Sequence, residues 1–68
     1  MDKEKFKLWR KKMGWTQSEA AVALGLSYIT IQSYERGSTG NGKPAAIPAA
    51  IALACAALAA GLKPYGQD

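Results

Sequence analysis

The segment from Gln17 to Tyr34 places two short helical stretches on either side of a three-residue turn, Gly25-Leu26-Ser27. Two helices that cross at roughly 90–120° after so short a turn must touch closely, so a small side chain is needed where they meet. Ala21 is that side chain, and Gly25 can adopt the left-handed conformation that stops the first helix. Apolar side chains then fill the wedge between the helices: Leu24, Leu26 and Ile31. The pattern predicts a helix-turn-helix over about residues 17–35.

Capping signals define the helices along the chain. Thr16-Gln17-Ser18-Glu19 is a capping box, Asp2 and Ser27 are further N-cap residues, and Pro48 suits the first turn of a last helix. We expect helices at residues 2–13, 17–24, 27–35 and 48–60, with a flexible loop at 37–46. The predicted fold class is all-α, a compact bundle of four to five short helices that forms a single domain over residues 1–68.

Length and charge narrow the range of functions. A chain of 68 residues buries only about 60% of its unfolded surface, which leaves little room for a deep catalytic pocket and favours help from a second copy. The formal net charge is +4, and six of the nine basic residues precede Met13. A basic surplus of this kind favours a polyanionic partner, nucleic acid first.

The sequence offers little for catalysis or metal binding. It contains no histidine and one cysteine, Cys55, which is too few ligands for a zinc site and rules out an internal disulfide. There is no paired-carboxylate arrangement, and the stretch Gly37–Lys43 lacks the spacing and preceding strand of a phosphate-binding loop. We therefore expect no enzyme, no cofactor, no metal and no small-molecule ligand.

Residues 44–62 carry no charge, so a membrane helix has to be considered. The stretch is mostly alanine and is interrupted by Pro44, Pro48 and Gly61, which makes it a poor span and a good packed helix. The charged N-terminus lacks the apolar region of a signal peptide, and a lone thiol suits a reducing compartment. We expect a cytoplasmic protein, in the nucleoid of a bacterial or phage-infected cell, with no membrane partner.

Taken together, these residues resemble the XRE-type helix-turn-helix family, which includes the phage repressors and Cro-like proteins. The resemblance extends from about residue 6 to residue 44. It is carried by Arg10, Gly14, Thr16-Gln17, Ala21, Leu24-Gly25-Leu26-Ser27, Ile31, Tyr34-Glu35-Arg36-Gly37 and Pro44. It implies a protein that binds double-stranded DNA and regulates transcription, with the third helix in the major groove.

The resemblance assigns base contacts to the start of the third helix. The corresponding residues here are Tyr28, Ile29, Gln32 and Ser33. Tyr28 can stack or hydrogen-bond, Ile29 can contact a thymine methyl, and Gln32 can bind adenine through two hydrogen bonds. Part of the specificity is then expected to come from DNA shape.

Phosphate contacts are expected around this helix. The N-terminus of the second helix favours anions, and by resemblance Gln17 touches a backbone phosphate. The expected phosphate contacts are Thr16, Gln17, Ser27, Arg36, Ser38, Asn41 and Lys43. Arg10 and Glu35 resemble the internal ion pair of the family, which ties the first helix to the end of the third.

The last helix has two interpretations. It either packs only on its own domain or also meets a second copy, because small side chains let helices approach closely and no charge lies between Lys43 and Lys63. We favour a homodimer. The expected interface comprises Ile51, Leu53, Ala54, Cys55, Leu58 and Leu62.

Two functional hypotheses remain open. The first is a homodimeric repressor or autoregulator that binds an inverted repeat; in size and layout the chain is similar to the anti-CRISPR-associated phage autorepressors. The alternative is a protein-binding module, such as the antitoxin of a toxin–antitoxin pair. Only a few residues follow the last helix, which favours the first hypothesis.

Overall fold

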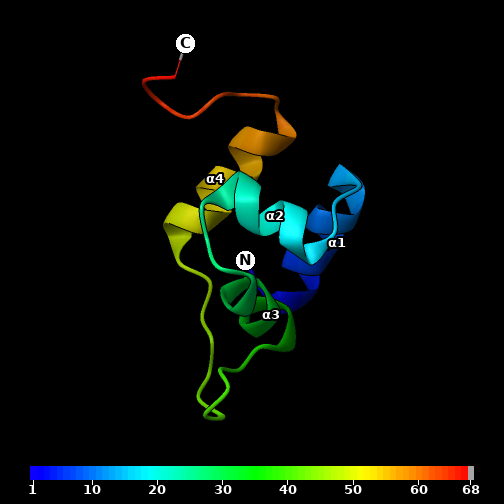
Figure 1. Cartoon of the computed structure of the whole chain (residues 1–68), viewed down its shortest axis with the longest axis vertical. Helices are drawn as coiled ribbons and strands as arrows, with labels where there is room; N and C mark the ends of the chain where they lie inside the picture. The colour runs from blue at the N-terminus through cyan, green and yellow to red at the C-terminus, as the bar shows by residue number, and fades with distance from the viewer. Residues whose placement is uncertain (68) are drawn as a thin grey trace.

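A computed structural model describes residues 1–67 of the chain. It contains four helices, α1 (Lys3–Met13), α2 (Gln17–Leu24), α3 (Tyr28–Arg36) and α4 (Ala49–Ala59). The loop after α3 projects from one end of the molecule, and the C-terminal tail lies at the other end (Figure 1). The all-α class is confirmed; within residues 1–67 the sole β-type pairing is an isolated bridge between Ser38 and Pro44.

The predicted caps explain where the helices begin and end. The Thr16 hydroxyl accepts from the Glu19 amide at 3.2 Å, and the Glu19 carboxylate accepts from the Thr16 amide at 2.9 Å. Ser27 accepts from the amide of Thr30 at 3.1 Å. Gly25 has φ of 69°, a conformation that other residues rarely adopt, so the chain can turn sharply from α2 into α3.

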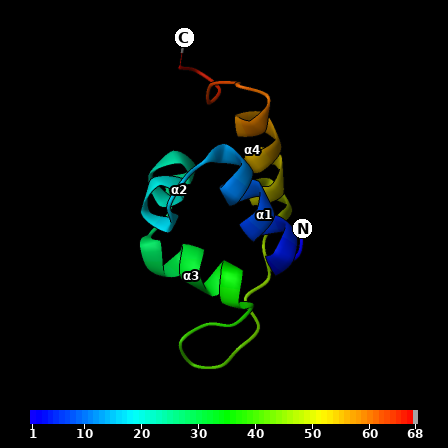
Figure 2. The same cartoon turned by 90° about the vertical axis from the view of Figure 1, so that its right-hand side faces the viewer.

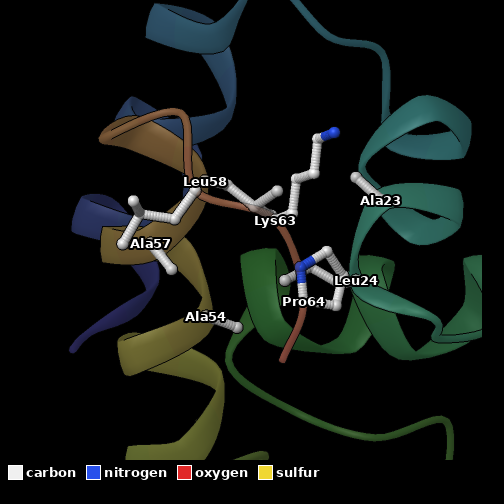
Figure 3. A pocket seen from close by; sticks show the side chains of 8 residues that line it. Ala23, Leu24, Ala54, Ala57, Leu58, Lys63 and Pro64 are labelled. Atoms are coloured by element: carbon white, nitrogen blue, oxygen red, sulfur yellow. The ribbon is translucent and has the colours of Figure 1, made fainter. Parts of the chain in front are cut away.

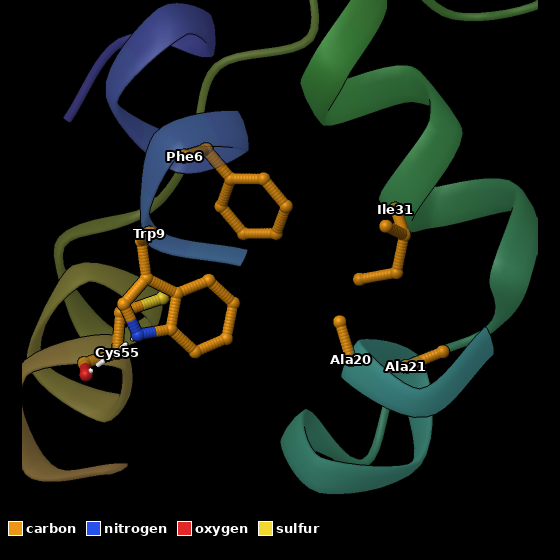
Figure 4. Packing of buried hydrophobic residues seen from close by; sticks show 6 residues of the cluster. All are labelled: Phe6, Trp9, Ala20, Ala21, Ile31 and Cys55. Carbon is orange, nitrogen blue, oxygen red and sulfur yellow. Dashed lines mark hydrogen bonds between the residues drawn. The ribbon is translucent and has the colours of Figure 1, made fainter. Parts of the chain in front are cut away.

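The core lies where the four helices meet. Its buried side chains are Phe6, Trp9, Ala20, Ala21, Ile31 and Cys55 (Figure 4). Ala20 and Ala21 let α2 approach α3 closely, as the turn geometry requires. The indole Nε1 of Trp9 donates to the Cys55 carbonyl oxygen at 3.0 Å, so its polar edge is satisfied while it joins α1 to α4.

An ion pair joins α1 to the end of α3. Arg10 donates through Nε and Nη2 to the two carboxylate oxygens of Glu35, at 2.5 and 3.0 Å, and its Nη1 donates to the Trp15 carbonyl at 2.9 Å. The two side chains are 13% and 6% exposed. This pair, which the resemblance implied, is therefore a structural clamp that fixes the direction of α3.

Two expectations about the second half of the chain need correction. Pro48 is the N-cap of α4 and not a residue of its first turn. The loop expected to be flexible contains a hydrogen-bonded hairpin instead: the Thr39 amide donates to the Lys43 carbonyl at 2.7 Å, and the Ala45 amide donates to the Gly37 carbonyl at 3.1 Å. We call residues 38–44 the arm.

Candidate nucleic-acid interface

The exposed face of α3 begins at its first residues. Tyr28 and Ile29 are 45% and 65% exposed, whereas Ile31 is fully buried. Tyr28 and Gln32 are four residues apart and share one face of the helix, and the exposed Ile29 lies beside them, so these three residues form the outer side of α3. A short helix with its N-terminal part exposed in this way can enter a DNA groove.

Gln32 and Tyr28 are joined on this face. The Gln32 Nε2 donates to the Tyr28 hydroxyl at 3.2 Å. The bond uses one of the two amide N–H groups, so the other N–H and the carbonyl oxygen stay available. The pair therefore presents one donor and one acceptor from Gln32 in a fixed orientation, which is what two-bond contact with adenine requires.

Ser33 was predicted to face the bases, and the structure contradicts this. Its side chain is only 8% exposed. It is therefore enclosed within the domain and is not available to a base. A serine is small enough to be tolerated there, and the position was assigned to the bases by the resemblance alone.

The start of α2 lies beside α3, as in a helix-turn-helix. Thr16 is exposed, but its hydroxyl and amide are both used by the capping box. Gln17 is half-buried, and its Nε2 donates to Glu35 Oε1 at 3.3 Å. The Gln17 side chain thus also holds α2 against α3, a role that the sequence analysis did not predict.

The charge of Glu35 is balanced from several sides. Its burial alone would raise its pKa, but hydrogen bonds from Arg10 and Gln17 and the positive charges of Arg10 and Lys7 outweigh burial, so the pKa of Glu35 lies below its usual value. The same hydrogen bond raises the pKa of Arg10. This acidic residue of α3 is consequently neutralised within the domain and does not repel a polyanion.

Positive charge continues beyond α3. Arg36 is exposed and its Nε donates to the Ser38 carbonyl and hydroxyl at 3.1 and 3.3 Å. Asn41 and Lys43 are exposed on the arm. No acidic residue occurs from position 36 to position 67, so this part of the interface carries positive charge only.

A comparison with known families decides what this arrangement is. A family model described as helix-turn-helix matches residues 6–56, which covers most of α1, all of α2 and α3, and most of α4. The chain belongs to the XRE-type helix-turn-helix family. It is therefore a DNA-binding protein of a class that regulates transcription. No curated protein and no solved structure matches the chain.

Two further observations concern other functions of this XRE-type protein. Among residues 1–67, no helix is both long and apolar enough to cross a membrane. The same part of the chain holds no group of three or more His, Cys, Asp or Glu residues that could bind a metal ion.

The expected dimer residues of the XRE-type chain separate onto two faces of α4. Cys55 is fully buried, so it cannot contact a second copy, and burial raises the pKa of its thiol to about 11. Ile51 and Leu58 are partly buried against the core. Leu53 on α4 and Leu62, which follows the end of the helix, are exposed, at 71% and 61%. The prediction merged inner and outer faces because no polar residue on α4 distinguishes them.

An apolar groove runs between α2 and α4. Its cavity volume is about 220 Å³, and Figure 3 shows Ala23 and Leu24 on one side with Ala54, Ala57 and Leu58 on the other. Leu62, Lys63 and Pro64 complete the lining. The sequence analysis missed this groove and also Val22, an 84% exposed residue of α2. Val22 could have been found from the sequence, because it is an apolar residue at a helical position that does not face the core.

Proposed function

We propose that this chain is a sequence-specific DNA-binding repressor that binds an inverted repeat as a homodimer. The observation that carries the proposal is the exposed start of α3, where Tyr28 and Gln32 are hydrogen-bonded and Ile29 stands beside them. A rigid helix with polar and apolar groups side by side can distinguish base pairs in the major groove.

Each of the three side chains has a definite chemistry in that groove. Gln32 can donate to adenine N7 and accept from adenine N6 while its second N–H remains on Tyr28. Ile29 offers only an apolar surface, which suits a thymine methyl group. Adenine and thymine are paired, so a half-site rich in A·T base pairs follows from these residues.

Phosphate contacts would fix the position of α3 in the groove. The amides at the start of α2 and the helix dipole favour an anion there. On the other side, Arg36 and Lys43 supply positive charge next to the end of α3. These contacts carry no sequence information, but they set the register in which α3 reads the bases.

The proposed dimer would form on the outer face of α4. Leu53 is exposed. It lies four residues before Ala57, which lines the apolar groove, so Leu53 stands on α4 beside the edge of that groove. In a two-fold interface the same patch meets itself, so each copy can place Leu53 against the groove of the other. Such an interface covers the exposed Leu53 and Leu62, which a monomer would leave in water.

Selection from a pool of randomised duplexes with the purified protein tests this function. We expect enrichment of an inverted repeat, with half-site centres about 34–36 Å apart or a multiple of that spacing. Enrichment of a single, unrepeated site would contradict the dimer, and recovery of an unselected pool would contradict sequence-specific binding.

A compact regulator of this kind fits a phage or mobile element, including an anti-CRISPR-associated operon.

The apolar groove also favours the second candidate, an antitoxin-like module. A groove lined by Leu24, Leu58 and Leu62 can accept an amphipathic segment of another protein. In that case the protein would remain monomeric without its partner, because the groove would not be filled by a second copy. Sedimentation of the purified protein at high micromolar concentration distinguishes the two candidates.

A further inference from the structure

The arm, residues 38–44, is a compact hairpin. The Gly42 amide donates to the Thr39 carbonyl at 2.9 Å, the Thr39 hydroxyl accepts from the Lys43 amide at 3.2 Å, and Ser38 is bridged to Pro44. Arg36 holds the base of the hairpin through its two hydrogen bonds to Ser38. The arm therefore projects as an ordered element and not as a loose loop.

The two glycines at the tip of the arm have different explanations. Gly42 has φ of 77°. This is the left-handed conformation that a three-residue hairpin loop requires at the residue following its turn. Gly40 is not among the glycines with positive φ, and a Cβ added there would meet nothing within 4 Å. The fold thus requires glycine at position 42 but gives no reason for one at position 40.

A glycine that the fold does not require can mark a place where the backbone approaches something outside the chain. At the tip of the arm, Gly40 and Gly42 flank Asn41, so Asn41 carries the one side chain on three consecutive residues. The tip is narrow for this reason. Lys43 stands behind it, exposed, and no acidic residue lies on the arm.

The arm lies on the side of the molecule that α3 exposes. In both views it extends past α3, away from α1 and α2, and the C-terminal tail is at the opposite end (Figure 1 and Figure 2). With α3 in a major groove, the end of α3 reaches the phosphate backbone, and the arm continues across that backbone. The next feature of the duplex in that direction is a minor groove.

We propose that the tip of the arm enters the minor groove beside the half-site contacted by α3, an inference that rests on the proposed function. The groove is about 6 Å wide, which a tip without bulky side chains can enter. The Asn41 amide donates to adenine N3 or thymine O2 on its floor, and Lys43 stays at its phosphate wall. Narrow A·T-rich minor grooves carry an enhanced negative potential, so the arm favours A·T pairs flanking each half-site.

Dimethyl sulfate provides the test, since it methylates guanine N7 in the major groove and adenine N3 in the minor groove. The probe is a duplex recovered by selection with the wild-type protein. We expect protection of guanine N7 at the guanines inside the half-site, together with protection of adenine N3 at its flank. Protection in the major groove without protection of the flanking adenines would overturn the arm proposal and leave the proposed function standing. If no duplex is bound or protected, both fail.

Three variants sharpen the test. Gly40→Ala is expected to melt at or above the wild-type temperature, because it restricts the unfolded chain and meets no neighbour in the fold. Gly40→Leu places bulk at the tip, so we expect it to lose adenine protection and to bind at least about tenfold more weakly, with melting and α3 contacts retained. Gln67→Leu, an exposed position at the opposite end, adds similar bulk and should bind as wild type does. Equal affinity of wild type and Gly40→Leu would refute the arm proposal.

Discussion

Replacing Glu35 with alanine should destabilise the fold strongly in the absence of DNA. The change removes two hydrogen bonds from Arg10 and one from Gln17, and it leaves the Arg10 side chain, which is 13% exposed, without a counter-charge. Loss of one partner of a buried pair typically costs about 3–5 kcal/mol. Because Arg10 keeps its bond to the Trp15 carbonyl, we expect the lower end of that range, about 3 kcal/mol.

That loss is large for a domain of this size. Stabilities of about 0.05–0.15 kcal/mol per residue give a total of roughly 3–10 kcal/mol, and 1 kcal/mol corresponds to about 4–8 °C in melting temperature. Thermal unfolding followed by circular dichroism should therefore show a decrease of about 12–24 °C. Glu4→Ala is the control, since it removes an equal charge at an exposed position of α1. Similar melting of both variants would refute the clamp.

The pH dependence of the melting temperature is a second test of the pair formed by Arg10 and Glu35. The pKa of Glu35 is lower in the folded state than its usual value of 4.5, so its contribution is present in full above that value and is lost as the pH falls through the folded pKa. The difference in melting temperature between wild type and Glu35→Gln should be constant near neutral pH and shrink below about 4.5. A difference that stays constant through this acidic range would contradict a lowered pKa.

Three further predictions concern α4 and the arm. Leu53→Glu should give folded monomers in sedimentation, whereas Leu8→Glu, at an exposed leucine of α1, should leave the dimer intact; a wild type that is monomeric at high micromolar concentration, free and on DNA, would contradict the dimer. The Cys55 thiol, with its pKa raised to about 11 by burial, should be unreactive toward a disulfide reagent at pH near 8 until denaturant is added, and rapid reaction of the native protein would show that α4 is not packed as described. Lys43→Ala should weaken binding to all duplexes alike and reduce the slope of log affinity against log salt by about one; an unchanged slope would remove Lys43 from the phosphate contacts.

Local signals made the helix boundaries predictable. The Thr16–Glu19 capping box and the Ser27 cap act within three residues of the chain, so their geometry can be inferred without knowledge of the fold. The contact of Arg10 with Glu35 spans 25 residues. No local pattern specifies such a contact, and it was expected only because the chain resembles a family that has it.

Other features depended on tertiary packing. The uncharged α4 gave no indication of which side faces the core, so Cys55 was placed at an interface although it lies in the core. Ser33 was placed on the DNA side by the resemblance, as a residue one turn into the third helix, but it is buried within the domain. The arm was expected to be flexible from its glycine and serine content, yet the Thr39 hydroxyl and the left-handed Gly42 organise it as a hairpin.

If the exposed face of α3 reads bases, Gln32→Ala should lose affinity for the operator selectively, and equilibrium binding measures this loss. Affinities of wild type and variant are measured on the selected operator and on a scrambled duplex of equal length, at one fixed salt concentration. We predict a loss of about 1–3 kcal/mol on the operator and almost none on the scrambled duplex, because Gln32 holds a base contact and no phosphate. Equal losses on the two duplexes would show that α3 contacts only the phosphate backbone and does not read bases.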